Sequence, residues 1–222
     1  AGSTQTYNNI PQEMVPIENR DMGDHLILRL RAEPPHLNIL LDTADAGASY
    51  IANGFIFETL LMVDGETLDF IPHIAKSWEI SEDHLTYTFH LRDDVHFSDG
   101  VPLTAHDVVF TYEVGKHPLS GVASSEGYKR VLKLDVKDDR RFTMTIDRIT
   151  FDYNSLGLTL LPAHIEKPIF DANPAEYRNK TAYDTDSTNP GLAFGPFRIV
   201  EIVPGSRITL EHNQTWTGEK PH

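Results

Sequence analysis

Residues 84–113, HLTYTFHLRDDVHFSDGVPLTAHDVVFTYE, contain the clearest structural pattern in the chain. Apolar residues alternate with polar ones from Leu85 to Leu91, which is the period of a half-buried β-strand. Acidic and small polar residues follow at 93–100, and such side chains favour turns because they bond to nearby backbone. We therefore expect a strand that buries one face and stops at Arg92.

A helix start follows this turn. Pro102 favours an extended entry, and Thr104 and Asp107 have the spacing of a capping box. In such a box a hydroxyl and a carboxylate bind main-chain amides that the first helical turn leaves free. The pattern predicts a helix from about Ala105 to about Val114.

Further strands are expected after this helix. Residues 131–136 and 142–146 alternate in the same way and are joined by a charged connection, so we expect both in one sheet with residues 84–92. Residues 197–203 and 207–211 also alternate, and a Pro-Gly-Ser turn separates them.

The chain before residue 84 is less regular. Residues 1–24 are polar and carry two prolines, which is typical of a leader or tether, although an ordered surface arm is the alternative. A strand is expected over residues 26–30. The spacing of apolar residues from Ala48 through Phe55 to Leu61 predicts a helix with one apolar face.

A hairpin and a tryptophan-centred strand are expected next. Asp64-Gly65 is a hairpin turn signal, followed by a short segment over residues 68–70 and a strand around Trp78. Trp78 has two interpretations, a ligand platform or an anchor at the core or its rim. The anchor is favoured because most such tryptophans serve that role.

Three other segments complete the expected outline. Residues 116–130 are rich in glycine and serine and are predicted to be a loop. A short helix is expected over residues 163–169. Residues 171–194 carry two Asn-Pro pairs and are predicted to be a polar connection.

Composition restricts the function. The chain has 222 residues, 40% of them hydrophobic, so it can bury a sizeable core. Its formal net charge of -14 disfavours binding to nucleic acid or anionic membranes. The absence of cysteine excludes disulfides and thiolate sites. No apolar run has the roughly 18 residues that span a bilayer, and no signal peptide stands at the start. We expect either a cytoplasmic protein or one that begins after a removed signal.

The sequence contains 11 histidines, which raises the question of a metal site. His84, His90, His96 and His106 are the densest group, but they lack H-E-x-x-H or comparable spacing. Metal-assisted hydrolysis through these side chains is therefore only a distant hypothesis.

The sequence also gives little support for a calcium site. Asp93, Asp94 and Asp99 do not follow the D-x-D-x-D-G pattern of a calcium loop, and turn chemistry accounts for them. No nucleophile elbow, phosphate loop or dinucleotide fingerprint is present. We expect no metal, no cofactor and no enzymatic activity.

Residues 76–113 resemble the signature region of the peptide-type extracellular solute-binding proteins of ABC importers, solute-binding family 5. Other matching motifs follow the family's order from about Leu26 to the end. They are Phe57-Glu58-Thr59-Leu60-Leu61, Leu161-Pro162-Ala163-His164-Ile165, Gly195-Pro196-Phe197-Arg198-Ile199 and Arg207-Ile208-Thr209-Leu210-Glu211-His212-Asn213.

The resemblance implies a fold class. It is mixed α/β, a partial two-lobed periplasmic-binding-protein fold of mixed sheets with flanking helices, lacking the second ligand-binding lobe. Residues 25–44 with 163–222 would form part of lobe one, and residues 45–162 the extra domain of the peptide-binding group. Family members carry a third domain after the region matching residues 213–216, so this chain is expected to be a fragment.

The resemblance also implies ligand contacts through backbone rather than side chains. Peptide-binding relatives pair a loop with the peptide as an added strand, and the matching positions are Asp45, Ala46 and Gly47. An ordinary strand-to-helix connection is the alternative for these three residues. The family's ligand tyrosine falls near Val122 and Ala123, where no aromatic residue stands; Tyr128 is out of register.

Two functions of different classes are thus expected. The first is a non-enzymatic receptor, periplasmic or extracellular, that delivers peptides or a related small solute to ABC permease subunits and reaches the membrane only through them or a lipid anchor. Relatives also bind nickel complexes, haem or sugars. The second is a truncated interaction module that uses an exposed lobe surface.

Overall fold

The computed structural model describes residues 34, 36–41, 46–64, 66–67, 69–149 and 160–218. All of them belong to one compact unit, Leu30–Pro221. The expected leader at 1–24 and the expected strand at 26–30 lie outside the described residues. No helix in the described ranges combines the length and the apolar character that crossing a bilayer requires.

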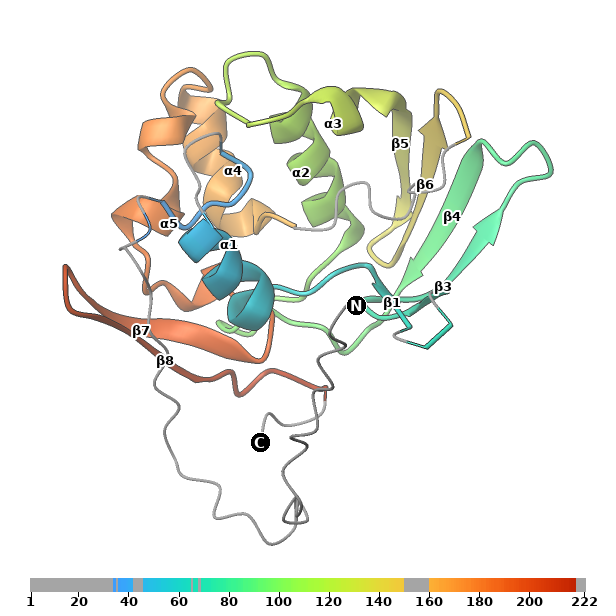
Figure 1. Cartoon of the computed structure of the whole chain (residues 1–222). Helices are drawn as coiled ribbons and strands as arrows, with labels where there is room; N and C mark the ends of the chain where they lie inside the picture. Colours follow the sequence, from blue (N-terminus) through green and yellow to red (C-terminus); the bar gives the residue numbers. More distant parts are fainter. Residues whose placement is uncertain are drawn as a thin grey trace, which may run out of the picture. The chain divides into compact units, whose positions relative to one another are not determined.

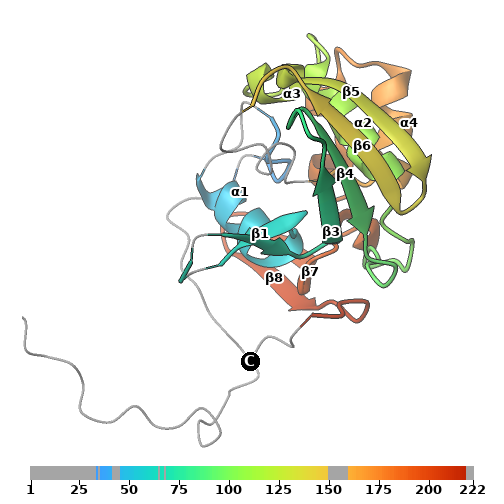
Figure 2. The ribbon, with the colours of Figure 1, turned by 90° about the vertical axis from the view of Figure 1, so that its right-hand side faces the viewer.

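Helix α2 (Ala105–Lys116) lies at the centre, with helix α4 (Ala163–Ala172) on one side and a sheet on the other (Figure 1). The sheet has four antiparallel strands, and its order confirms that the predicted segments share one sheet. From edge to edge the strands are β3 (Ala75–Ile80), β4 (Thr86–Leu91), β6 (Arg141–Ile146) and β5 (Val131–Asp138) (Figure 2).

Strand β4 confirms the alternation seen in the sequence. Tyr87, Phe89 and Leu91 are buried, whereas the residues between them are half-exposed. Phe89 stacks on Phe142 of β6 with ring centroids 5.1 Å apart. On the other side Phe89 pairs with Trp78 of β3, which is half-buried and packs against the core, as expected of an anchor.

The capping box is also confirmed. The Thr104 main-chain N–H donates to Asp107 Oδ2 at 2.7 Å, and the His106 N–H donates to Thr104 Oγ1 at 3.3 Å. Helix α2 continues to Lys116, slightly beyond the predicted end, and the Lys116 ammonium donates to the Val131 carbonyl of β5.

The edge strands of the sheet are irregular, in contrast to the central pair. Strand β3 shifts register between Ala75 and Ser77. Strand β5 shifts between Val131 and Lys133 and again between Val136 and Asp138. The β4 and β6 pairing keeps one register throughout.

The helix predicted from Ala48 to Leu61 is shorter than expected, so that prediction is wrong at its end. Helix α1 (Ala46–Ile51) continues as a π-helix, η2 (Ala52–Ile56), and stops there. The Ile56 carbonyl accepts hydrogen bonds from the N–H groups of Phe194 and Gly195, at 3.0 and 2.9 Å. The Ile56 carbonyl is thus paired with N–H groups that are distant in sequence rather than with those of a continuing helix. Leu61 begins a strand instead.

That strand, β1 (Leu61–Val63), pairs with β2 (Phe70–Pro72), so the predicted hairpin exists. Its connection is wider than the predicted Asp64-Gly65 turn, and β2 begins later than expected. Asp64 Oδ1 accepts hydrogen bonds from the main-chain N–H groups of Glu66 and Thr67 and so stabilises the turn. Gly65 and Leu68 lie outside the described residues.

Residues 126–130, predicted to be part of a loop, form helix α3 (Glu126–Arg130). The short helix expected over residues 163–169 is present and extends to Ala172. The prediction of a polar connection over 171–194 is wrong, because Tyr177, Tyr183 and Phe194 are almost fully buried. Three short helices place these side chains: η4 (Tyr177–Asn179), α5 (Ala182–Thr185) and η5 (Pro190–Leu192).

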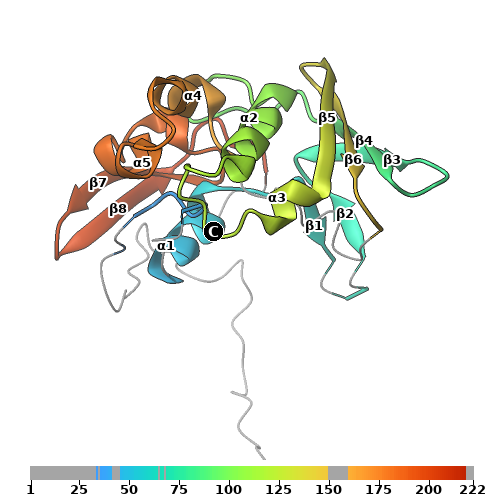
Figure 3. The ribbon, with the colours of Figure 1, turned by 90° about the horizontal axis from the view of Figure 1, so that it is seen from above.

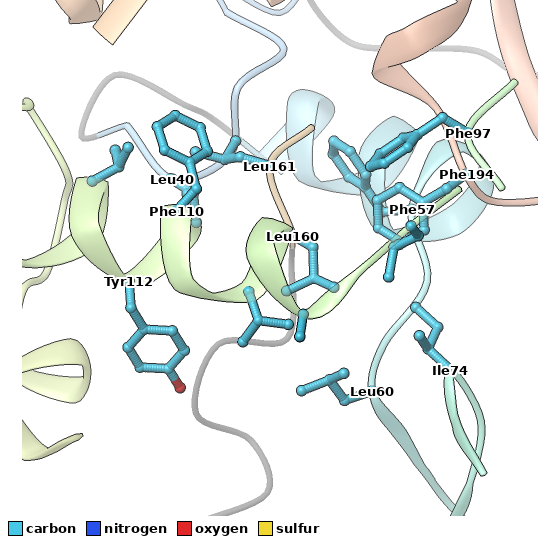
Figure 4. Close-up of a cluster of buried hydrophobic side chains, with 14 of the residues drawn as sticks. Leu40, Phe57, Leu60, Ile74, Phe97, Phe110, Tyr112, Leu160, Leu161 and Phe194 are labelled. Atoms are coloured by element: carbon cyan, nitrogen blue, oxygen red, sulfur yellow. The ribbon is translucent and has the colours of Figure 1, made fainter. Parts of the chain in front are cut away.

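One hydrophobic core joins these parts. Figure 4 shows side chains from both sides of α2 in this core, with Phe57, Phe97 and Phe194 gathered together. The Phe97 and Phe194 ring centroids are 5.5 Å apart, as are those of Phe57 and Phe194. A separate hairpin of β7 (Phe197–Val203) and β8 (Arg207–His212) packs its β7 strand against η2 (Figure 3).

Candidate functional site

The loop expected to contact a ligand leads into α1. Ala46 and Gly47 form the first turn of this helix, and Asp45 lies outside the described residues. The π-helix at the other end of α1 is fixed by the N–H groups of Phe194 and Gly195. Helix α1 is thus joined through η2 to residues 194–195.

Val122 and Ala123, where the family's tyrosine would fall, lie next to residues 40–41, which precede α1 in the sequence. Val122 forms an isolated antiparallel bridge with Leu41, and the Ala123 N–H donates to the Leu40 carbonyl at 3.0 Å. The structure therefore brings residues 40–41 and 122–123 side by side, although about eighty positions separate them in the sequence.

Tyr128, the nearest aromatic residue in the sequence, has a core contact. Its ring packs in α3 against Tyr112 of α2, with centroids 5.3 Å apart. Gly115 provides the space, because a Cβ atom there would stand 2.4 Å from the Tyr128 ring. Burial raises the pKa of Tyr128 to about 12, as expected of a core side chain.

A hollow of about 420 Å³ opens beside Val122. Its floor and walls come from the loop after α2 and from the connection after α4, both of which appeared in the sequence only as polar linkers. Gly121 has a φ of +80°, and a Cβ atom there would lie 2.9 Å from the Arg178 Cβ atom. The residues that shape the hollow include His117, Leu119, Gly121, Val122, Ala175 and Arg178.

The hollow offers mixed chemistry. Leu119 is 58% exposed and provides apolar surface, while the Arg178 guanidinium and the His117 imidazole provide hydrogen-bond donors or acceptors. Such a mixture suits a ligand that has both polar groups and hydrocarbon, such as a peptide or an amino-acid derivative. No sequence motif marks His117 or Arg178, because only the fold brings them together.

A cluster of buried polar side chains connects residue 38 to α4 and to the connection after it. The Thr181 hydroxyl donates to both carboxylate oxygens of Glu166 at 3.0 Å, and the Ala182 N–H donates to Oε1 at 2.8 Å. The Asn38 amide nitrogen lies 3.2 Å from both Thr181 Oγ1 and Tyr177 Oη. Burial raises the pKa of Glu166, and the hydrogen bonds that it accepts act in the opposite direction.

The histidines considered as metal ligands stand apart from one another. His90 lies 3.5 Å from Glu79, and His106 lies 3.6 Å from Asp139. His96 Nδ1 contacts the Asp94 carbonyl, and His84 occupies a turn with a φ of +57°. In the described part of the chain, no three His, Asp or Glu side chains gather in a way that fits a metal ion.

The aspartates considered for calcium have other contacts. Asp94 forms a salt bridge with Arg92 at 2.7 Å. Asp99 accepts the Val101 N–H at 3.0 Å and contacts His164 at 2.9 Å. The contact of Asp99 with Val101 is of the turn type that the sequence favoured.

The chain is similar to known proteins over most of its length. It is 30% identical over 208 residues to the oligopeptide-binding protein AppA of Bacillus subtilis, covering 90% of this chain and 36% of AppA. It is 26% identical over 210 residues to the probable D,D-dipeptide-binding periplasmic protein DdpA of Escherichia coli, covering 90% of this chain and 38% of DdpA. The chain thus spans a little over a third of the length of these curated relatives.

Solved structures show the same likeness. The structure of AppA in complex with a nonapeptide matches 83% of this chain and 35% of AppA, with a TM-score of 0.69 and 26% identity. The structure of NikZ from Campylobacter jejuni in complex with Ni(L-His) matches 85% of this chain and 35% of NikZ, with a TM-score of 0.67 and 25% identity. The observed mixed α/β arrangement therefore corresponds to part of the periplasmic-binding-protein fold.

A family model matches residues 69–222, which include the sheet, α2, α4 and the β7–β8 hairpin. This match covers well over half of the chain. The chain belongs to the bacterial extracellular solute-binding proteins, family 5.

Proposed function

We propose that the complete protein captures a peptide, or a related small solute, and delivers it to the permease of an ABC importer without changing it chemically. The observation that carries this proposal is the agreement in fold with AppA, whose structure holds a nonapeptide. Membership of the solute-binding family supports it. Relatives named as periplasmic binding proteins support a location outside the cytoplasm, with a lipid anchor or the permease as the link to the membrane.

The ligand lies, in this proposal, against Asp45, Ala46 and Gly47 and extends towards the hollow beside Val122. Residues 25–44 with 163–222 contribute to lobe one, and residues 45–162 form the extra domain. The second lobe belongs to the rest of the complete protein and closes over the solute. The closed form gains contacts with the solute from both lobes, and the permease recognises the closed form.

A peptide is the first candidate for the ligand because backbone pairing reads any peptide sequence. Nickel chelates and other small solutes remain competing ligands, since NikZ was solved with Ni(L-His). The formal net charge of -14 argues against a nucleic-acid partner.

One observation favours a second function, that of an interaction module. Met62, Val63 and Ile71 of the β1–β2 hairpin are 43%, 52% and 37% exposed. Met62 and Ile71 face each other across the hairpin and form a small apolar surface. A partner that covers this surface would make the chain associate with itself or another protein, which size-exclusion chromatography over a range of concentrations detects.

Native mass spectrometry of the complete protein, purified without denaturation, tests the transport proposal. We expect a bound mass that matches a peptide or small solute and that leaves on unfolding. A complete protein that carries no adduct and binds neither peptides nor nickel chelates by calorimetry would contradict the proposal.

A further inference from the structure

The segment that leads into the proposed ligand loop is held by a chain of buried hydrogen bonds. Asn38 is 1% exposed and uses both ends of its side chain. Its Oδ1 atom accepts the Leu40 N–H at 3.2 Å, and its Nδ2 atom donates to Tyr177 and Thr181. The Leu41 N–H closes the same turn on the Asn38 carbonyl at 3.2 Å.

Glu166 gives this chain of hydrogen bonds a direction. An ionised carboxylate only accepts hydrogen bonds, so the Thr181 hydroxyl must use its one hydrogen on Glu166. The Thr181 oxygen is then left as an acceptor, which obliges Asn38 to present its NH₂ group there and its carbonyl oxygen to Leu40. A group at position 166 that also donates would remove this constraint.

The turn at Asn38 fixes the residues next to it. The Leu40 carbonyl accepts a hydrogen bond from the Ala123 N–H, and Leu41 forms a β-bridge with Val122. The turn therefore helps to position Val122, which lines the hollow. Residues 42–45 then lead into Ala46 and Gly47, the positions proposed to contact the solute. The hydrogen bonds of Glu166 therefore reach the 121–123 loop beside the hollow, through the contacts of Leu40 and Leu41.

We propose that Glu166 is a positioning residue for ligand binding, acting through Thr181 and Asn38 on the 38–41 turn and on the facing 121–123 loop. The expected effect of Glu166 on ligand affinity rests on the proposed function. The coupling between Glu166 and the turn stands on the hydrogen bonds alone and can be measured without a ligand.

The test compares Glu166→Gln with Asp107→Asn in the complete protein. Both residues are buried carboxylates with a raised pKa, but Asp107 accepts its hydrogen bonds from Thr104 and Ala163, whereas Glu166 accepts them from Thr181 and Ala182. Hydrogen exchange followed by NMR or mass spectrometry reports on the Leu40, Leu41 and Ala123 amides. Calorimetry with a bound peptide reports on affinity.

We expect Glu166→Gln to speed exchange at these amides and to weaken peptide affinity by about tenfold, as loss of one well-formed buried hydrogen bond does. Asp107→Asn should leave peptide affinity near the wild-type value, and any loss of stability should speed exchange across the fold rather than at these three amides in particular. Thr181→Val removes the Thr181 link between Glu166 and Asn38 without changing Glu166, and it leaves the Tyr177 link in place. It should speed exchange at the same amides and serves if Glu166→Gln does not fold.

Equal exchange patterns in the position-166 and position-107 variants, or unchanged exchange at Leu40 and Ala123, would overturn the proposal. Faster exchange with unaltered peptide affinity would show that the turn is coupled to Glu166 but does not position the ligand. A wild-type protein that binds no solute would contradict the proposed function, while the exchange result would still decide the coupling.

Discussion

Asp107 Oδ1 accepts the main-chain N–H of Ala163 at 2.8 Å and thereby joins the first turn of α2 to the first turn of α4. The other oxygen of the same carboxylate accepts the Thr104 N–H within the capping box. One side chain thus satisfies amides at the starts of two helices. Asparagine has a single acceptor oxygen and would turn its NH₂ group towards one of these donors.

We expect Asp107→Asn to lower the free energy of unfolding by about 1–3 kcal/mol, because one buried N–H loses its acceptor. Urea unfolding followed by circular dichroism measures this. The control is Asp171→Asn at the exposed end of α4, which should change stability little.

The same carboxylate predicts a pH dependence. Burial raises the pKa of Asp107, so the folded protein binds this proton more tightly than the unfolded chain does. Its contribution to stability is therefore largest below its ordinary value of 3.8 and falls as the pH rises through the raised pKa. The difference in free energy of unfolding between the wild type and Asp107→Asn should shrink as the pH rises through this range. A difference that grows with pH would contradict the raised pKa of Asp107.

Gly195 is expected to tolerate no side chain. A Cβ atom there would lie 2.9 Å from main-chain atoms of Phe55 and Ile56, which cannot move without disturbing the π-helix. Gly195→Ala should cost about 1–3 kcal/mol of stability. Gly54→Ala is the control, since nothing lies within 4 Å of its Cβ position, and it should be neutral or stabilising by about 0.4–1 kcal/mol. Equal effects at the two glycines in thermal unfolding would refute the steric argument.

Two buried tyrosines should respond in opposite ways to loss of the hydroxyl. The Tyr112 hydroxyl is buried and has no hydrogen-bond partner among the described residues. Tyr112→Phe should therefore stabilise the fold by about 1 kcal/mol, since it removes an unsatisfied polar group. Tyr183 donates to the Leu192 carbonyl at 3.2 Å, and Tyr183→Phe should cost about 0.5–1.5 kcal/mol. Chemical denaturation of the pair measures both signs, and destabilisation by Tyr112→Phe would mean that its hydroxyl has a partner.

The hollow beside Val122 is tested with two exposed leucines. Leu119 lines it and is 58% exposed, whereas Leu132 is 64% exposed on β5 and is not among the residues lining the hollow. Leu119→Glu should weaken solute binding by about tenfold, because a ligand seated there would have to desolvate a carboxylate. Leu132→Glu should leave affinity unchanged. Calorimetry on the complete protein compares them, and equal affinities would remove the hollow from the site.

The parts of the fold that could be predicted from sequence are those with a strong local signal. The alternation in β4 and the capping box at Thr104 and Asp107 each depend on neighbours within a few residues, and both are confirmed. The hairpins at 131–146 and 197–212 were found for the same reason, since period and turn composition agree there.

The parts that could not be predicted depend on distant contacts. The end of η2 at Ile56 is decided by donors at 194 and 195, which no pattern near residue 56 reveals. Tyr177 and Tyr183 are buried in short helices surrounded by polar residues, so neither a helical nor a strand period marks them. The hollow likewise arises where two linkers meet. The proposed contacts at 45–47 came from family resemblance, and they remain a prediction.

The register shifts in β3 and β5 have a consequence for how the protein behaves at high concentration. The outer strands of an open sheet present main-chain groups on which another chain can build, and this is a common route to aggregation. Here both outer strands are bulged while the central pair is regular, so an incoming strand meets donors and acceptors that are out of phase. The irregularities thus disfavour the addition of a strand from another chain at either edge of the four-stranded sheet seen in the described residues.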